Sequence, residues 1–319
     1  MISEIIAQNQ LFFHIVVLVS CLYIMAKASD LAVYSVSRYA SRLGLSDCIV
    51  GILVVAIASS MPELVSSITG SGFDQPGIVV GTIFGSNLVE LALVIGVAAF
   101  LSKKMITTSK VLEKSEFFIF LFMLFPFLLL IDGILSRLDG FLLVACFFLY
   151  VYFLWKKEGK LGKIKKDVLI KNIWKDGLIF SLNLVVLLLS GMFLVFSSVS
   201  LARDLGVTPY VISLTAIAIG SSMSDLMVSL KSIKQKHAGV GYGNAIGSSI
   251  VKSLLFLGVI ALVKPVVFSF NSIWTIMIFM ILLVFMVLFW ARNGFITRAQ
   301  GIILILIYIA FISIQLCLH

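Results

Sequence analysis

The stretch Ala56-Ile57-Ala58-Ser59-Ser60-Met61-Pro62-Glu63 decides the fold, because the chain contains a second, closely similar copy of it. The second copy, in the other half of the chain, is Ala218-Ile219-Gly220-Ser221-Ser222-Met223-Ser224-Asp225. Positions 56–97 align with positions 218–259 without a gap, and the identical residues include serines and glycines as well as apolar residues. Apolar similarity alone would not place polar residues in register, so we infer an internal duplication.

The duplication continues into a second polar stretch at the same offset. Gly85-Ser86-Asn87-Leu88-Val89-Glu90 corresponds to Gly247-Ser248-Ser249-Ile250-Val251-Lys252. Apolar segments that are interrupted by glycine, at corresponding places in the two halves of a chain, indicate the binding site of a transporter.

The composition excludes a soluble domain, because 61% of the 319 residues are hydrophobic and only 12% are charged. Apolar runs of about 20 residues have the length that crosses a bilayer. The sequence therefore predicts an all-α membrane protein with about ten transmembrane helices in two inverted five-helix repeats. The predicted spans are 11–36, 44–70, 77–101, 115–132, 139–155, 177–202, 207–231, 239–263, 272–291 and 299–317.

A basic polar segment, residues 156–176, divides the chain into two halves of five predicted spans each. It contains eight lysines and three acidic residues, a composition that is typical of a solvated loop. We therefore expect residues 1–155 to form the first repeat, 156–176 a basic cytoplasmic linker, and 177–319 the second, inverted repeat.

Lysines and arginines gather in alternate loops, and this predicts the orientation because short cytoplasmic loops carry the excess of positive charge. Twenty of the 24 basic residues fall on one side, whereas only Arg137, Arg203 and Lys264 fall on the other. Both termini are therefore expected outside the cytoplasm, and five spans per half turn the second half upside down. The same asymmetry accounts for the net charge of +9, so no nucleic acid is expected as a partner.

Four ionisable residues lie deep in apolar spans: Glu63, Glu90, Asp225 and Lys252. Charged side chains are costly in hydrocarbon, so they normally face a cavity, pair with one another and mark an ion or proton path. An ion pair that only fixes helix packing is the alternative. It does not explain why the four residues occupy positions related by the repeat, and we therefore expect an ion path.

The neighbouring residues suit a hard cation, since Ca²⁺ takes about six to eight oxygen ligands. The two serine pairs supply hydroxyl oxygens, and Pro62 lacks an N–H group and so frees the carbonyl of Ala58. Ser224 replaces this proline in the second copy, which predicts a less interrupted backbone there. Small residues allow helices to approach closely, so that ligands from several helices can converge. Four glycines of the duplicated stretches can serve this purpose: Gly81, Gly85, Gly243 and Gly247.

At these residues the chain resembles the cation/Ca²⁺ exchanger superfamily, which includes the sodium/calcium exchangers. That family carries two inverted repeats, each with a Gly-Thr-Ser-Leu-Pro-Glu type motif followed by Gly-Asn-Ala-Ile-Gly-Ser. The corresponding stretches here are 58–63 with 81–86 and 220–225 with 243–248. The resemblance implies a secondary active transporter rather than an enzyme, one that exchanges Ca²⁺ for Na⁺ by alternating access and uses no cofactor.

The resemblance also implies roles for individual residues. Glu63 and Asp225 correspond to the two central acids of the ion site. The other implied ligands are the hydroxyls of Ser59, Ser60, Ser221 and Ser222, the outer hydroxyls of Ser86 and Ser248, and the carbonyls of Ala56 and Ala218.

Glu90 and Lys252 depart from the family pattern, which usually has Asn or Asp at these two positions. A lysine here places a tethered ammonium group where the family would hold an ion or water, and Glu90 supplies its counter-charge. With Glu63, Glu90, Asp225 and Lys252 all ionised, the site carries a net charge of −2. That charge suits one Ca²⁺ and leaves the number of Na⁺ sites open, so altered coupling is expected.

Two other functions stay open on the sequence. The same fold could couple cation transport to H⁺, because a lysine in a dry site can exchange its proton. Ser248 and Lys252 are four residues apart, like the serine/lysine dyad of an intramembrane hydrolase, but a hydrolase would not explain the inverted repeat. The scattered cysteines and histidines indicate no other metal site. The compact chain suits a prokaryotic inner membrane.

Overall fold

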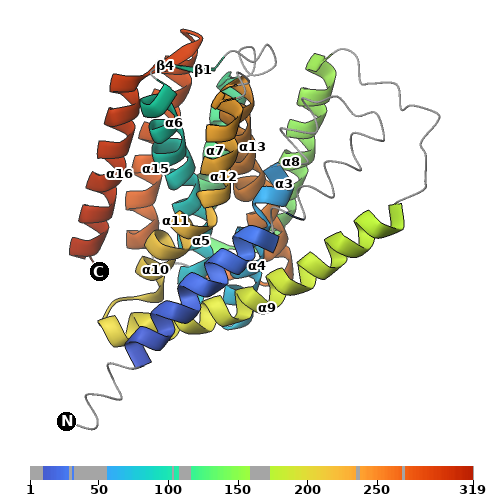
Figure 1. Ribbon diagram of the computed structural model, residues 1–319, viewed down its shortest axis with the longest axis vertical. Coiled ribbons are helices and arrows are strands. Elements are labelled where there is room, and N and C mark those ends of the chain that lie inside the picture. The colour runs from blue at the N-terminus through green and yellow to red at the C-terminus, as the bar shows by residue number, and fades with distance from the viewer. Residues whose placement is uncertain are drawn as a thin grey trace.

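The computed structural model describes residues 10–28, 31, 56–102, 104–107, 116–158, 173–234, 238–267 and 270–318. Helices dominate this part of the chain (Figure 1). The first repeat contains the helix Gln10–Ala28, α3 (Ala56–Ser59), α4 (Met61–Gly72), α5 (Pro76–Leu88), the π-helical turn η2 (Val89–Val94), α6 (Ile95–Ser102), β1 (Lys104–Ile106), α7 (Glu116–Leu129), β2 (Ile134–Leu135) and α8 (Arg137–Glu158). The second contains α9 (Ile173–Leu205), α10 (Pro209–Ile212), η3 (Ser213–Ile217), α11 (Ala218–Ser221), α12 (Met223–Lys234), α13 (Ala238–Ile250), η4 (Val251–Phe256), α14 (Leu257–Val263), β3 (Val266–Val267), α15 (Phe270–Ala291), β4 (Phe295–Thr297) and α16 (Arg298–Leu318).

Eight of the described helices are long and apolar enough to cross a bilayer. Two of the ten predicted spans are not among them. The predicted span 115–132 corresponds to α7, which is shorter, and residues 44–55 of the predicted span 44–70 lie outside the described residues. The all-α membrane fold with two repeats is confirmed, whereas the count of ten helices is not.

Two continuous helical segments form the centre of the molecule. Pro76–Ser102, which joins α5, η2 and α6, is 94% buried over its most apolar window, and Gly241–Val263 is 78% buried. The other spans are 22–59% buried, as expected for helices with one face towards lipid. The two buried segments correspond to each other in the duplication, so the duplicated motifs occupy the core.

Two short strand pairs reveal that the repeats are inverted. β1 pairs antiparallel with β4, with Met105 opposite Ile296, and β2 pairs with β3, with Leu135 opposite Val266. β1 and β3 occupy equivalent positions in the two repeats. The membrane span α15 lies between β3 and β4 in the chain, so these two strands are at opposite membrane faces. β4 pairs with β1, which places β1 at the face of β4. The equivalent strands β1 and β3 therefore lie at opposite membrane faces, as an inverted repeat requires.

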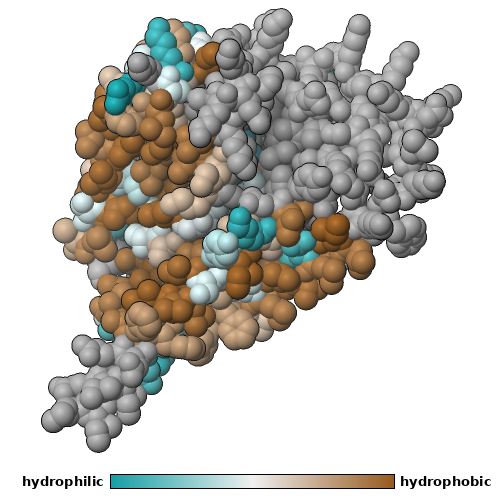
Figure 2. Space-filling view, in the orientation of Figure 1, coloured by the Kyte–Doolittle hydropathy of each residue, from teal (hydrophilic) through white to brown (hydrophobic). Residues whose placement is uncertain are grey.

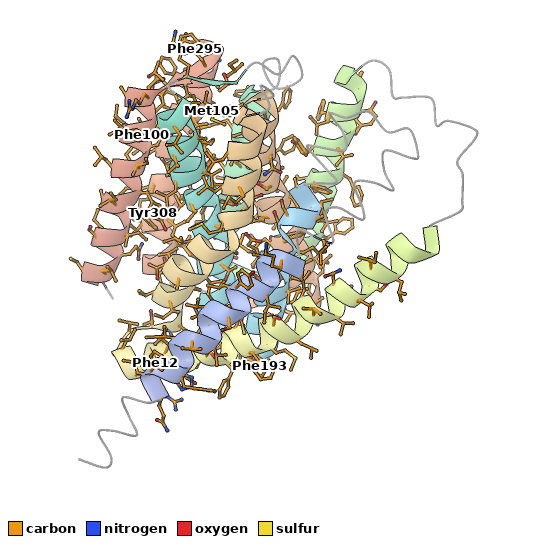
Figure 3. The ribbon with its side chains drawn as sticks, in the orientation of Figure 1. Phe12, Phe100, Met105, Phe193, Phe295 and Tyr308 are labelled. Carbon is orange, nitrogen blue, oxygen red and sulfur yellow. The ribbon has the colours of Figure 1, made fainter. Side chains whose placement is uncertain are left out.

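The first helix of each repeat packs obliquely against one side of the central bundle. Gln10–Ala28 and α9 cross the other helices obliquely, side by side (Figure 1), and their residues Leu18, Met25, Leu187 and Leu194 form a second apolar cluster with residues of α4, α5, α10 and η3. Their outer faces are apolar too. Figure 3 shows Phe12 and Phe193 on these two helices, and both side chains are more than half exposed.

The surface of the described residues is largely hydrophobic (Figure 2). Polar and basic groups lie mainly towards the ends of the helices, where Lys104 lies over the ring of Phe295 and Arg298 over that of Phe100. Cations stacked on aromatic rings at helix ends are typical of the membrane–water interface. An apolar belt between such ends is what a lipid-embedded chain requires.

Candidate cation-binding site

Both copies of the first motif interrupt a helix at the same place. α3 and α4 are separated at Ser60, whose φ and ψ angles are −89° and 9°, and α11 and α12 are separated at Ser222, with angles of −76° and −1°. We expected a less interrupted backbone in the second copy, because Ser224 replaces Pro62. That expectation is wrong: the break forms without a proline, so the surroundings that the repeats share create it.

The central acids lie just beyond these breaks and are fully buried. Glu63 and Asp225 are both 0% exposed. Glu63 Oε1 and Oε2 and Asp225 Oδ2 accept no hydrogen bond of good geometry from the residues that the structure describes, although the Ser221 hydroxyl lies within hydrogen-bonding range of the Glu63 carboxylate. Buried carboxylate oxygens without partners are costly. They are therefore candidates for contact with a cation.

The serines at the breaks repeat the same arrangement. Ser60 and Ser222 are 0% and 1% exposed, and within the described part of the chain neither hydroxyl has a hydrogen-bond partner. They join Glu63 and Asp225 as two pairs related by the repeat, each of which offers unsatisfied oxygen. A pseudo-symmetric set of four such residues would be improbable as a packing defect, because buried polar groups are nearly always satisfied.

Ser59 and Ser221 are placed differently from their neighbours. Their hydroxyls donate to the carbonyls of Ala56 and Ala218, at 3.3 Å in each repeat. The same two carbonyls also accept the N–H groups of Ser60 and Ser222 at 3.2 Å. Each of these two serines thus bonds to the predicted carbonyl ligand of its own helix, and the Ser221 hydroxyl also lies within hydrogen-bonding range of Glu63.

The outer serines also bond within their own helices. Ser86 Oγ donates to the Ile83 carbonyl at 3.1 Å, and Ser248 Oγ donates to the Asn244 carbonyl at 2.8 Å. Both side chains are completely buried. A hydroxyl that donates its proton in this way keeps lone pairs available for a cation.

Lys252 and Glu90 form a buried ion pair. Lys252 Nζ lies 2.6 Å from Glu90 Oε1, both side chains are 0% exposed, and Ser249 Oγ donates to Glu90 Oε2 at 2.7 Å. Each charged residue lies in a π-helical turn, η2 for Glu90 and η4 for Lys252. Single π-helical turns inside α-helices frequently occur at functional sites. The pairing that the sequence predicted is therefore present.

The four ionisable residues form one electrostatic cluster. Glu63 lies within electrostatic range of Lys252 and Asp225, and Glu90 lies within range of the same two residues. Among the described residues, no three His, Cys, Asp or Glu side chains converge as a metal-binding group. A cation held here would consequently need hydroxyl and carbonyl oxygens in addition to the carboxylates.

Asn244 and Asn87 are polar members of the site that we did not predict. Asn244 Nδ2 donates to Asp225 Oδ1 at 2.9 Å, and Asn87 Nδ2 donates to Ser253 Oγ at 2.6 Å, with all four side chains buried. Asn87 and Asn244 are in the duplicated stretches, beside Ser86 and in the Gly-Asn-Ala motif. Their place in these stretches could have indicated that the two amides belong to the site, but the sequence does not reveal the residues to which they donate hydrogen bonds.

Close helix approach holds these elements together. A Cβ atom added at Gly81 would lie 2.9 Å from the Tyr210 carbonyl oxygen and 3.0 Å from the Leu214 backbone nitrogen. α5 therefore packs directly on the backbone of α10 and η3, as small residues in membrane helices allow.

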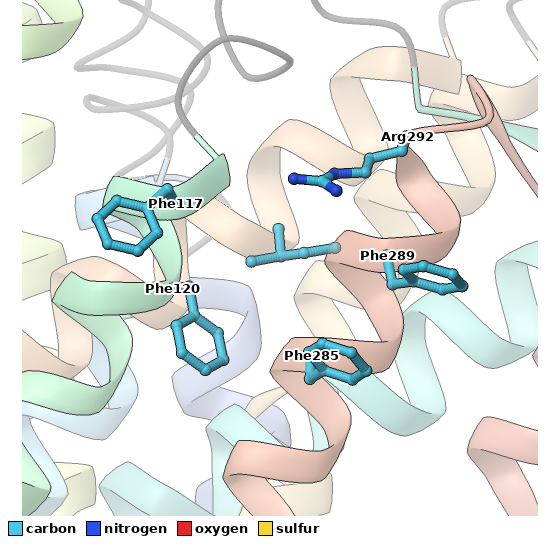
Figure 4. A pocket seen from close by; sticks show the side chains of 6 residues that line it. Phe117, Phe120, Phe285, Phe289 and Arg292 are labelled. Atoms are coloured by element: carbon cyan, nitrogen blue, oxygen red, sulfur yellow. The ribbon is translucent and has the colours of Figure 1, made fainter.

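The ion-site candidates are distinct from a cavity between α7 and α15. That cavity is about 300 Å³ in volume and is lined by Phe117, Phe120, Phe285, Leu288, Phe289 and Arg292 (Figure 4). None of the predicted ligands lines it. Its aromatic walls suit an apolar occupant rather than a cation.

Comparison with known proteins agrees with this arrangement. The model of the protein family described as 'Sodium/calcium exchanger protein' matches residues 13–156 and 176–317. Uncharacterized membrane protein MJ0091 of Methanocaldococcus jannaschii is 30% identical over 299 residues, which cover 92% of this chain and 94% of that protein. Putative antiporter CaxA of Alkalimonas amylolytica is 31% identical over 307 residues, which cover 91% and 94%.

A solved structure has the same fold. The sodium-calcium exchanger NCX_Mj, soaked with 2.5 mM Na⁺ and 1 mM Sr²⁺, matches with a TM-score of 0.69 and 27% identity over 94% of this chain and 97% of that chain. The family match spans both duplicated regions, and the chain therefore belongs to the sodium/calcium exchanger protein family.

Proposed function

We propose that the chain is a secondary active antiporter that moves Ca²⁺ across the membrane against Na⁺ by alternating access. The observation that carries this proposal is the pseudo-symmetric set of buried side chains Ser60, Glu63, Ser222 and Asp225, each with at least one oxygen that lacks a hydrogen bond of good geometry from the described residues. Hydroxyl and carboxylate oxygens are the ligands that Ca²⁺ and Na⁺ prefer. They lie at or just beyond the two helix breaks, and discontinuous helices bind ions in transporters.

The remaining predicted residues complete the proposed site. Glu63 and Asp225 supply the charge, Ser60 and Ser222 supply free hydroxyl oxygens, and Ser59, Ser221, Ser86 and Ser248 supply hydroxyls that already donate to backbone carbonyls. The carbonyls of Ala56 and Ala218 have two lone pairs each, so small adjustments of these serines would free them for an ion. The transported ions are the ligands, and no cofactor is required.

Lys252 alters the proposed coupling. Its ammonium group is fully buried against Glu90, at a position where a mobile cation could otherwise bind. A tethered charge cannot cross the membrane, so we propose that it replaces one transported cation. This makes the transport stoichiometry differ from that of a site with Asn or Asp at both positions.

H⁺ is the second candidate for the coupling ion. A buried ammonium group beside three carboxylates could bind and release a proton during the cycle. The serine/lysine hydrolase is less well supported, because Ser248 Oγ donates to the Asn244 carbonyl and Lys252 is paired with Glu90.

For the location, we propose a prokaryotic inner membrane with both termini outside the cytoplasm. The inner membrane protein YrbG of Escherichia coli is 27% identical over 296 residues, and the distribution of lysines favours this orientation. In this arrangement residues 1–155 and 177–319 are the two repeats and the basic linker 156–176 is cytoplasmic, with α8 reaching into the linker as far as Glu158 and α9 beginning within it at Ile173.

Transport by the purified protein tests the proposal. Proteoliposomes loaded with Na⁺ should accumulate ⁴⁵Ca²⁺ when they are diluted into Na⁺-free buffer, and liposomes without protein should not. Uptake driven by a pH gradient but not by Na⁺ would favour H⁺ as the coupling ion. Absence of Ca²⁺ uptake under both gradients would refute the proposed function.

A further inference from the structure

The fixed charge of the site is set by four side chains that are all buried. Glu63, Glu90, Asp225 and Lys252 are each 0% exposed, and Lys252 Nζ lies 2.6 Å from Glu90 Oε1. Ser249 satisfies the second oxygen of Glu90, and Asn244 satisfies one oxygen of Asp225. Both donors are neutral, so neither changes the charge. With all four groups ionised, the protein contributes three carboxylates and one ammonium group, which sum to −2.

A buried site of this charge favours cargo that neutralises it. An uncompensated charge in a low-dielectric interior is costly, so the form that crosses the membrane should carry cargo of +2. One Ca²⁺ meets this condition, and so do two monovalent cations. A third Na⁺ would leave a net positive charge beside a lysine that already repels cations.

We infer that this protein exchanges one Ca²⁺ for two monovalent cations and that the exchange moves no net charge across the membrane. The inference rests on the proposed antiport function and deepens it. Lys252 is the residue that determines it, because its ammonium group takes the place of a third transported cation and stays with the protein.

Exchange of two monovalent ions per Ca²⁺ differs from exchange of three in how the equilibrium Ca²⁺ gradient depends on the membrane potential. With two per Ca²⁺, the equilibrium Ca²⁺ gradient depends on the square of the driving-ion gradient and not on the membrane potential. With three, one net charge moves per cycle, and about 100 mV then changes the equilibrium Ca²⁺ ratio by about fiftyfold. The two cases are therefore separated by a single imposed potential.

The test measures equilibrium ⁴⁵Ca²⁺ accumulation by proteoliposomes at a fixed Na⁺ gradient, with the potential set by K⁺ gradients and valinomycin. We expect the same accumulation at zero potential and at about 100 mV, and a slope of about two against the Na⁺ gradient on logarithmic axes. If uptake requires a pH gradient, the same measurement is made with H⁺ as the driving ion. A change of about fiftyfold with potential would overturn the inference and leave the antiport function standing. If neither gradient drives Ca²⁺ uptake, the proposed function fails, and the inference fails with it.

A double variant tests the assignment to Lys252. Lys252→Asp combined with Glu90→Asn makes the fixed charge −3, so it should take up a third Na⁺ and become sensitive to potential. The matched control is Lys264→Asp combined with Asp74→Asn, the same exchange at an exposed ion pair, with side chains 43% and 81% exposed. The control should stay insensitive to potential. A site variant that transports Ca²⁺ but stays insensitive would overturn the assignment to Lys252.

Discussion

The side-chain amide of Asn244 donates a hydrogen bond of 2.9 Å to Asp225 Oδ1, and both side chains are almost completely buried. Thr82 stands at the equivalent position of the first repeat, and within the described residues its hydroxyl has no hydrogen-bond partner. The two central acids are therefore held differently. Asp225 is oriented by the amide of Asn244, whereas the hydroxyl within hydrogen-bonding range of Glu63 is that of Ser221, from the other repeat.

This difference predicts that Asn244 positions Asp225. Asn244→Ala should raise the Ca²⁺ concentration that gives half-maximal exchange by about tenfold, because a buried carboxylate loses its orienting donor. Asn244→Asp should be worse still, since it adds a charge beside Asp225. The control Asn183→Ala removes an exposed amide on α9 that bonds to the Ile179 carbonyl, and it should leave Ca²⁺ activation unchanged. Equal effects of Asn244→Ala and the control would contradict the positioning role.

Glu63 should be indispensable. Glu63→Ala removes one of the two fully buried central acids, so we expect Ca²⁺ exchange to be abolished while the protein still inserts into the membrane. Transport in proteoliposomes and elution on size exclusion report the two properties separately. Asp132→Asn, which changes an exposed acid in the loop before β2, serves as the control and should transport normally. Uptake near the parent level in Glu63→Ala would remove the proposed site.

Breaking the buried ion pair from one side should destabilise the fold. Lys252→Met leaves Glu90 buried without its cation, which typically costs about 3–5 kcal/mol. Adding Glu90→Gln removes the orphaned charge and should recover most of the loss in apparent melting temperature. Lys264→Met breaks an exposed pair instead and should cost no more than about 1 kcal/mol. If the single and double variants at the buried pair melt alike, then the two residues do not stabilise each other.

Gly81 should tolerate no side chain. In Gly81→Ala the new methyl group would press on the Tyr210 carbonyl and the Leu214 backbone nitrogen, and overpacking of this kind typically costs about 1–3 kcal/mol. Gly72→Ala is the matched control, because an added Cβ there meets nothing within 4 Å. We expect lower thermal stability and lower transport only in the Gly81 variant. Equal melting of the two variants would show that α5 has room to move away from η3.

The orientation predicts which residues can be labelled from each side of the membrane. In a variant without native cysteines, a cysteine replacing Lys160 should react with an impermeant maleimide only from the cytoplasmic side. Lys160 lies outside the described residues, so this prediction rests on the charge pattern alone. A cysteine replacing Asp132, which is exposed in the loop between α7 and α8, should react only from the other side. The opposite pattern of labelling would invert the topology.

The sequence by itself determined the membrane class, the duplication and the identity of the polar residues in the core. Hydrophobic length is a local property, and one constant offset along the chain relates Glu63 to Asp225 and Glu90 to Lys252 without any knowledge of the fold. The cost of charge in hydrocarbon then required these residues to face one another or an ion. Their pairing could therefore be predicted.

Only the tertiary structure decided which partner each polar group has. The bonds from Ser249 to Glu90 and from Asn87 to Ser253 join residues 159 and 166 positions apart, and the pairing of β1 with β4 joins the two repeats. Such distances depend on how two buried helices pack, which no local pattern encodes. The break at Ser222 illustrates the limit: the absence of a proline predicted a straighter helix, and the packing that both repeats share interrupted it all the same.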